Sequence, residues 1–311
     1  MNPRLRTYQG ETDYWDARAF LRRIRPEDAP PGGNWHVADF DYWRWHWLEN
    51  VVERSPEELC LWTDASGRMV AILNQGDPGV CHLHVDPGEL TEDLLDAMVG
   101  EAEARYATVL DDGRRIVCIW AMEHDATLNR VLTRRLYRRH TSAHSTEHNG
   151  KRALIDPVPA VSIPNGFTIR SMGDVDEHGR RSLASWRAFH PDEPDEGRDP
   201  SGVWYRNVQR APTYRRDLDI VVVAPNGDIA SFAVCYFDDV SRTGVFVLDG
   251  TATAYQRMGL AKAAMTEALR RLRWLGGTAA YVSWYDAPAG ALYTSVGFSD
   301  SALGRAWLKT L

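Results

Sequence analysis

One short stretch of the chain has the order of features that a phosphate-binding loop needs. It begins with the apolar run Val245–Leu248, passes through a turn at Gly259 and continues into a helix. A glycine at such a turn lets successive backbone N–H groups converge, and the start of the helix adds the positive end of its dipole. A Cβ atom at Gly259 would obstruct the approach of a phosphate to the backbone. The stretch therefore predicts a site for a pyrophosphate.

Two motifs in the second half of the chain resemble those of the GNAT acetyltransferases. Gln256-Arg-Met-Gly-Leu-Ala261 resembles the signature Q/R-x-x-G-x-G/A, and Ala291–Phe298, about 30 residues later, resembles the ending A-x-LY-x-x-x-GF. The resemblance covers roughly residues 167–311. It implies a mixed α/β sheet whose fourth and fifth strands, here Gly244–Leu248 and Ala279–Tyr285, splay apart and take the pantetheine arm of acetyl-CoA between them.

The resemblance also implies which residues hold the coenzyme. Backbone amides at the turn should bind the CoA pyrophosphate, and Arg257 should either pair with a CoA phosphate or face solvent. A main-chain amide near Leu248 or Asp249 should hold the oxyanion that develops during transfer. The expected cofactor-binding residues are Leu248, Gln256, Arg257, Met258, Gly259, Leu260, Ala261 and Lys262.

Two side chains are candidates for the proton transfers. Tyr293 occupies the position of the family's general acid, and a phenol with a pKa of about 10 is protonated at neutral pH. The alternative is an aromatic ring that only packs under a helix. Val247 stands where relatives carry a carboxylate, so Asp249 is the candidate base, because residues i and i+2 of a strand point to the same side. A turn cap at Asp249 and a water that deprotonates the amine are the alternatives.

The acceptor is expected to meet the loop after the first helix of the second half. This loop is rich in carboxylates, at Asp192, Glu193, Asp195, Glu196 and Asp199. It predicts a small cationic acceptor, although a solvated loop without a ligand is the open alternative. The resemblance implies acetyl transfer from acetyl-CoA to a primary amine by direct attack in a ternary complex. A non-catalytic acyl-CoA-binding or regulatory module is the alternative function.

A proline-rich connector, Asp156–Gly166, divides the chain near its midpoint and predicts two domains, residues 1–157 and 165–311. Both halves show the same order of elements, with hairpin turns at Ser66–Gly67 and Asn226–Gly227. We therefore expect an α/β fold of two tandem GNAT-like domains, an arrangement that resembles the mycothiol synthases.

The first half lacks the residues that would hold CoA. Pro87 and Glu89 stand where the second half has its glycine turn; proline has no N–H for a phosphate, and glutamate repels one. The position equivalent to Tyr293 falls near Leu132 and Thr133. We expect a degenerate domain without a CoA site, acting as a scaffold, a wall of the acceptor site or an interface.

Composition excludes several classes of protein. The net charge is −7 and neither half carries a basic excess, which disfavours a nucleic-acid partner. No apolar run reaches the roughly 18 residues of a membrane span, and the first residues are too polar for a signal peptide, so we expect a cytoplasmic protein. We also expect that the protein can form a homodimer.

No metal site is expected. The four cysteines, Cys60, Cys81, Cys118 and Cys235, stand singly in apolar stretches and should be buried and reduced. His140, His144 and His148 precede a predicted hairpin turn at Asn149–Gly150, and their spacing along a strand is too wide for one ion.

Overall fold

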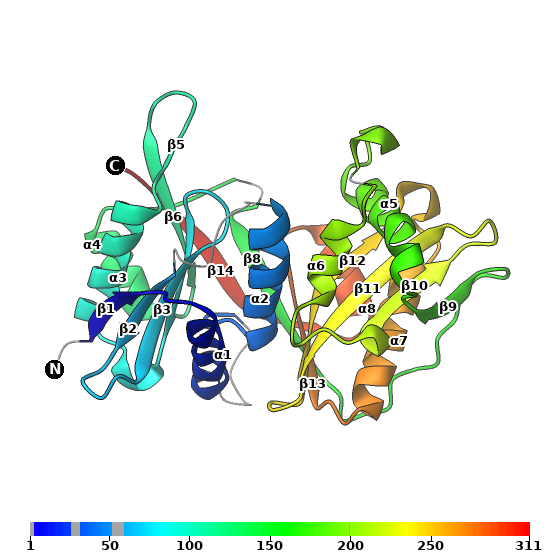
Figure 1. Ribbon diagram of the computed structural model, residues 1–311, viewed down its shortest axis with the longest axis horizontal. Helices are drawn as coiled ribbons and strands as arrows, with labels where there is room; N and C mark the ends of the chain where they lie inside the picture. The colour runs from blue at the N-terminus through cyan, green and yellow to red at the C-terminus, as the bar shows by residue number, and fades with distance from the viewer. Residues whose placement is uncertain (1–2, 26–31, 52–58, 143, 199) are drawn as a thin grey trace.

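A single mixed β-sheet runs through both halves of the molecule (Figure 1). The computed structural model describes residues 3–25, 32–51, 59–142, 144–198 and 200–311. Within these residues the 14 strands lie in the order β1-β2-β3-β4-β6-β14-β8-β13-β12-β11-β10-β9, with β5 beside β6 and β7 beside β14. The expected mixed α/β fold is confirmed.

The two halves contribute the following elements. The first half contains β1 (Arg4–Thr7), α1 (Glu11–Ile24), α2 (Val37–Tyr42), the π-helix η1 (Trp43–Val51), β2 (Cys60–Thr63), β3 (Met69–Gln75), β4 (Val80–Val85), the 3₁₀ helix η3 (Pro87–Glu89), α3 (Glu92–Arg105), β5 (Thr108–Val109), β6 (Arg115–Met122), α4 (Ala126–Arg134), β7 (Arg138–Arg139) and β8 (Thr146–Ala153). The second half contains β9 (Thr168–Ser171), η4 (Val175–Glu177), α5 (His178–Phe189), η5 (Asp195–Gly197), α6 (Val203–Gln209), η6 (Arg216–Leu218), β10 (Asp219–Val223), β11 (Ile229–Asp238), β12 (Thr243–Thr251), η7 (Thr253–Tyr255), α7 (Leu260–Trp274), β13 (Ala279–Trp284), α8 (Ala287–Ser295) and β14 (Ser299–Thr310).

The halves exchange strands at the centre of the sheet. β14, near the end of the chain, pairs antiparallel with β6 of the first half from Gly304↔Met122 to Thr310↔Ile116. β8 of the first half pairs antiparallel with β13 of the second half along residues 148–153, and β8 and β14 pair with each other. Figure 1 shows β14 among the strands of the first half. The proposed domains 1–157 and 165–311 thus each lend a strand to the other.

The two strands that the sequence predicts to splay do so. β12 and β13 pair in parallel at three positions, the last being Val245↔Tyr281, and then part. We call the place beyond this last pair the fork. In the first half β4 and β6 pair at two positions, Val80↔Cys118 and Cys81↔Ile119, before they part.

Matching details support the internal repeat. The turns of the two predicted hairpins contain Gly67 and Gly227, both with φ of 87°. After α4 and α8 the chain turns through Leu136 and Gly297, both with positive φ. The following N–H group donates to the carbonyl of Leu132 in the first half and of Tyr293 in the second. Leu132 therefore corresponds to Tyr293, as expected.

The second half's part of the sheet has a different cover on each face. One face packs against α7 and α8, which we call the α7 face. The other packs against α5 and α6 and also against Ala38 of α2 from the first half, and we call it the α5 face. The Asp41 carboxylate of α2 accepts hydrogen bonds from the backbone and hydroxyl of Thr213, which fixes α2 onto the second half.

The predicted hairpin at Asn149–Gly150 is wrong. Both residues lie within β8, which continues straight from Thr146 to Ala153. Asn-Gly is the strongest turn signal, but here pairing on both sides of the strand overrides it, and an ideal Cβ on Gly150 would lie 2.7 Å from the Trp284 ring. Glycine at 150 is explained by close packing rather than by a turn.

Candidate active site

The predicted phosphate-binding loop has open donors. Gly259 is the N-cap of α7 with φ of 78°, and Arg257 also has a positive φ, of 64°. No side chain caps the helix. The backbone N–H groups of residues 257–262 have no acceptor among the residues that the structure describes. An ideal Cβ on Gly259 would meet nothing within 4 Å, so the space above the loop is free.

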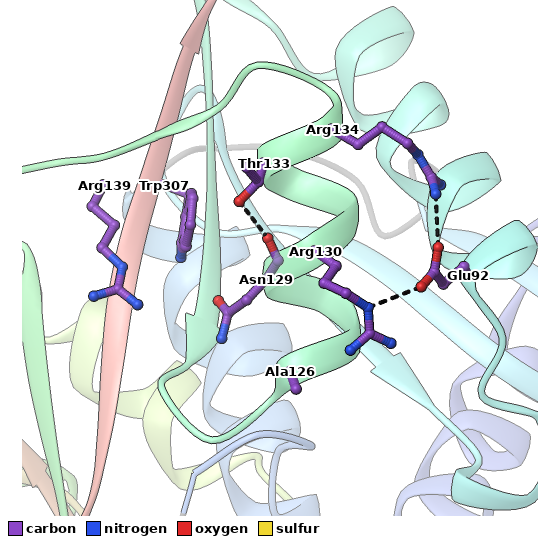
Figure 2. Close-up of a pocket in the computed structure, with 8 residues that line it drawn as sticks. All are labelled: Glu92, Ala126, Asn129, Arg130, Thr133, Arg134, Arg139 and Trp307. Carbon is purple, nitrogen blue, oxygen red and sulfur yellow. Dashed lines mark hydrogen bonds and ion pairs between the residues drawn. The ribbon is translucent and has the colours of Figure 1, made fainter.

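The equivalent helix of the first half is closed. The Thr91 side chain caps α3 by accepting from the Leu94 N–H. Glu92 lies in the first turn and binds Arg130 and Arg134 of α4 at 3.0 and 2.7 Å (Figure 2). A carboxylate and a side-chain cap therefore occupy the place of the open amides of α7.

The gap between the diverging ends of β4 and β6 is filled by residues 32–35 of the first half. The Asn34 side chain bonds both the N–H and the carbonyl of Val85 at the end of β4, and the Trp35 N–H donates to His84. Just before them, an ideal Cβ on Gly32 would lie 2.4 Å from Met122 at the end of β6. Residues 32–35 thus span from β4 to β6 at the first half's counterpart of the fork.

A β-bulge lies in β12 beside the fork. Leu248 pairs with Val234 and Phe246 with Cys235, so Val247 is the extra residue. Val247 packs on the α5 face, whereas Asp249 pairs opposite Ala233, whose side chain belongs to the α7 face. The expectation that Val247 and Asp249 share one face is wrong, because the extra residue breaks the alternation.

Asp249 and Tyr293 lie together on the α7 face. Burial raises the pKa of Asp249 to about 8, despite the opposing effects of the Val234 N–H, the Arg181 charge and the Tyr293 hydroxyl. Burial and the neighbouring Asp249 raise the pKa of Tyr293 above its usual value of 10.0. Near neutral pH both groups hold their protons, and Asp249 becomes able to accept one as the pH approaches 8.

The Tyr293 ring is packed as well as polar. It contacts Trp284 with ring centroids 5.6 Å apart and Phe298 at 6.2 Å. The packing role that the sequence left as an alternative is therefore present together with the contact to Asp249. Both are compatible with a phenol held in one orientation.

The acidic loop is partly neutralised. Asp195 binds Arg187 at 2.6 Å, and Glu193 lies 2.9 Å from the His190 ring nitrogen. Asp192 and Glu196 are exposed, and Asp199 lies outside the described residues.

Sequence reasoning missed the polar residues of the α5 face. His178, Arg181, Ser182 and Ser185 of α5 are all buried. Their spacing of three and four residues marks one helix face, which is the only signal that the sequence offered. Tyr42 of α2, from the first half, interacts electrostatically with both Arg181 and Asp249.

The described residues contain no group of three or more His, Cys, Asp or Glu that could hold a metal ion. They also contain no helix that is long and apolar enough to cross a membrane. The four cysteines are free thiols, three of them buried and Cys118 partly so.

Solved structures share this architecture over nearly the whole chain. A tandem GNAT protein from the clavulanic acid biosynthesis pathway, determined without AcCoA, has a TM-score of 0.68 and 13% identity, with 99% of this chain and 98% of that chain covered. A GCN5-related N-acetyltransferase from Sphaerobacter thermophilus has a TM-score of 0.65 and 16% identity, covering 99% and 95%. A GNAT-family acetyltransferase from Colwellia psychrerythraea has a TM-score of 0.60 and 10% identity, covering 99% of each chain. The fold is that of the tandem GNAT acyltransferases.

The sequence places the second half in a family. Residues 183–298 match the model of the acetyltransferase (GNAT) family. No curated protein matches the chain by sequence. Residues 183–298 therefore form a GNAT-family domain, and the chain as a whole shares the fold of tandem GNAT proteins, a fold that supports acyl transfer from acyl-CoA.

Proposed function

We propose that this protein is an N-acetyltransferase that moves an acetyl group from acetyl-CoA to a primary amine of a small molecule. The observation that carries the proposal is the uncapped start of α7 with its open donors, which follows β12 in the chain after that strand has parted from β13. Six consecutive backbone N–H groups that find no acceptor among the described residues fit the CoA pyrophosphate, and the free space over Gly259 lets it approach. Arg257 and Lys262 add positive charge at the same place.

The bulge supports the stabilisation of the transition state. An extra residue in a strand leaves main-chain groups outside the ladder, and here it lies next to Leu248 at the fork. We propose that a main-chain N–H near Leu248 binds the thioester oxygen as negative charge develops on it.

The two proton transfers are assigned to Asp249 and Tyr293. The amine attacks the thioester carbonyl, the C–N bond forms and the C–S bond breaks, leaving a thiolate. Tyr293 donates its proton to the sulfur, while Asp249 takes the proton that the amine must lose. Because the two groups interact, protonated Asp249 can return the proton to Tyr293. The proton count then balances within one turnover.

The acceptor and the first half have separate proposed roles. The exposed carboxylates Asp192 and Glu196 support attraction of the ammonium form of the amine. The first half, with its capped α3, is proposed to bind no CoA and to cover the acceptor side through α2.

Release of the CoA thiol from acetyl-CoA across a panel of small amines tests the proposal. We expect turnover with at least one primary amine and none with acetyl-CoA alone above the hydrolysis background. A protein that binds CoA but releases no thiol with any amine would instead fit a non-catalytic CoA-binding module.

A further inference from the structure

The α5 face holds a buried guanidinium, that of Arg181, which makes no hydrogen bond to any residue that the structure describes. Arg181 is 0% exposed, and its Nε, Nη1 and Nη2 have no partner among the described residues. Its Cζ lies 3.4 Å from the centroid of the Phe232 ring and 4.8 Å from that of Tyr205. Ring contacts hold the group in place but leave its N–H donors unsatisfied, which is costly for a buried charge. These donors therefore point to an anionic acceptor that binds here.

Other buried polar atoms near Arg181 also have no hydrogen-bond partner among the described residues. Asp219 uses one carboxylate oxygen to accept from the Tyr205 and Tyr214 hydroxyls, and its Oδ1 has no hydrogen-bond partner among the described residues. The hydroxyls of Ser182 and Ser185, on the same helix as Arg181, are likewise buried without a partner there. Helix α5 and the nearby Asp219 thus carry several buried polar atoms that have no partner in the described part of the chain.

This cluster lies close to the proposed transfer point. The Arg181 guanidinium stacks on the ring of Phe232. This ring packs against Gly250 of β12, because an ideal Cβ on Gly250 would lie 2.5 Å from it. Gly250 follows Asp249 directly, and Tyr42 interacts with the charges of both Arg181 and Asp249. A cation and a carboxyl group therefore flank the fork from the α5 face and the α7 face.

We propose that Arg181 binds a carboxylate of the acceptor, which makes the acceptor a small molecule that carries both a primary amine and a carboxylate, as amino acids do. The planar guanidinium matches a carboxylate through two parallel hydrogen bonds. The amine of the same molecule would then face Asp249. A dianion such as a phosphate fits less well, because Asp219 lies near the same guanidinium and would repel the second charge. This inference rests on the proposed N-acetyl transfer.

The test compares amino acids with their primary carboxamides, which keep the amine and lose the carboxylate. We expect the wild-type protein to favour the acids by at least about 10-fold in kcat/KM for thiol release from acetyl-CoA. Arg181→Met should raise KM for the acids by about 10- to 100-fold, bring the acid-to-amide ratio close to one and leave KM for acetyl-CoA unchanged. Arg210→Met is the control for the loss of an arginine over a ring, because the Arg210 Cζ lies 4.2 Å from the Trp45 ring centroid, directly after α6.

Several outcomes would overturn the inference. One is a wild-type protein without preference for acids over amides. Another is a loss in Arg181→Met that is equal for acids and amides, which would make Arg181 a buried structural charge beside Asp219. If Arg181→Met does not fold, Arg181→Lys keeps the charge but loses the planar donors and should still lower the ratio.

A binding measurement separates this inference from the proposed function. Amino acids should raise the melting temperature of wild-type protein, and their amides and the Arg181→Met variant should show no such effect. Stabilisation by amino acids without any thiol release would support the carboxylate site and contradict the transferase. Thiol release that shows no preference for acids over amides, together with equal melting temperatures in the presence of either, would support the transferase and contradict the carboxylate site.

Discussion

Tyr293 combines packing and chemistry in one side chain. Replacing it with phenylalanine keeps the ring contacts to Trp284 and Phe298 and removes only the hydroxyl. We expect Tyr293→Phe to lower kcat by about 100-fold and to leave CoA affinity unchanged, because a general acid acts in the transition state. Steady-state thiol release and calorimetric titration with CoA measure the two effects. Unchanged kcat would remove the acid role.

The raised pKa of Asp249 makes stability depend on pH. In the folded protein this carboxyl keeps its proton up to about pH 8, whereas in the unfolded chain it loses it near 3.8. Folding is therefore disfavoured progressively as pH rises from about 4 to about 8. We expect Asp249→Asn to match the wild-type melting temperature at pH 4.5 and to exceed it by several degrees at pH 8.5, because the amide has no charge to bury.

Activity gives an independent check on Asp249. If Asp249 accepts the proton of the amine, the rate of acetyl transfer by the wild-type protein should rise with pH through an apparent pKa of about 8. The Asp249→Asn variant should lose most of the rate and should no longer show this rise with pH. A profile that is the same in both proteins would leave Asp249 with a structural role alone.

Residue types predicted the positions of some candidate residues in the fold and not those of others. The glycine turn and Tyr293 were predictable because their motifs are local in sequence. The side of the strand on which Asp249 lies was not, because a bulge at Val247 depends on pairing with β11. Arg181 was missed because an arginine on a helix ordinarily indicates solvent, and only the tertiary packing buries it.

At the scale of elements, the two helix starts differ in what satisfies their N–H groups. α3 has a threonine cap and an acidic first turn, whereas α7 has neither. The two predicted strands, Gly244–Leu248 and Ala279–Tyr285, agree with β12 and β13 to within a few residues, because an apolar run bounded by turn residues is a local signal. The pairing of β8 and β14 across the two halves was not predicted, because the residue pattern of a strand does not determine which other strand it pairs with.

The loop before α7 offers a sharp test of the CoA site. Gly259→Val should lower CoA affinity by at least about 100-fold, because a side chain would fill the space over the open donors. Gly113→Val is the control, since Gly113 has φ of 83° and also nothing within 4 Å of an ideal Cβ. Both variants should lose similar stability from backbone strain, about 1–3 kcal/mol, but only the first should lose CoA binding in calorimetry. Equal CoA affinity in the two variants would contradict the assignment.

At the scale of the whole molecule, the exchanged strands join the halves more firmly than the connector does. Produced alone, residues 165–311 would lack β8 beside β13 and would leave β14 without either neighbour. We expect this fragment to aggregate or remain unfolded, and co-production with residues 1–164 to yield a soluble complex. Size-exclusion chromatography with circular dichroism measures both, and a monomeric fragment with cooperative unfolding would contradict the expectation.

The position of β14 also sets the order in which the protein can assemble during synthesis. β6 is complete once residue 122 has been made, yet the strand that covers its open edge begins only at residue 299. Throughout the intervening translation the nascent first half presents an unpaired sheet edge on the ribosome. Its need for chaperones should therefore end only after β14 has left the exit tunnel.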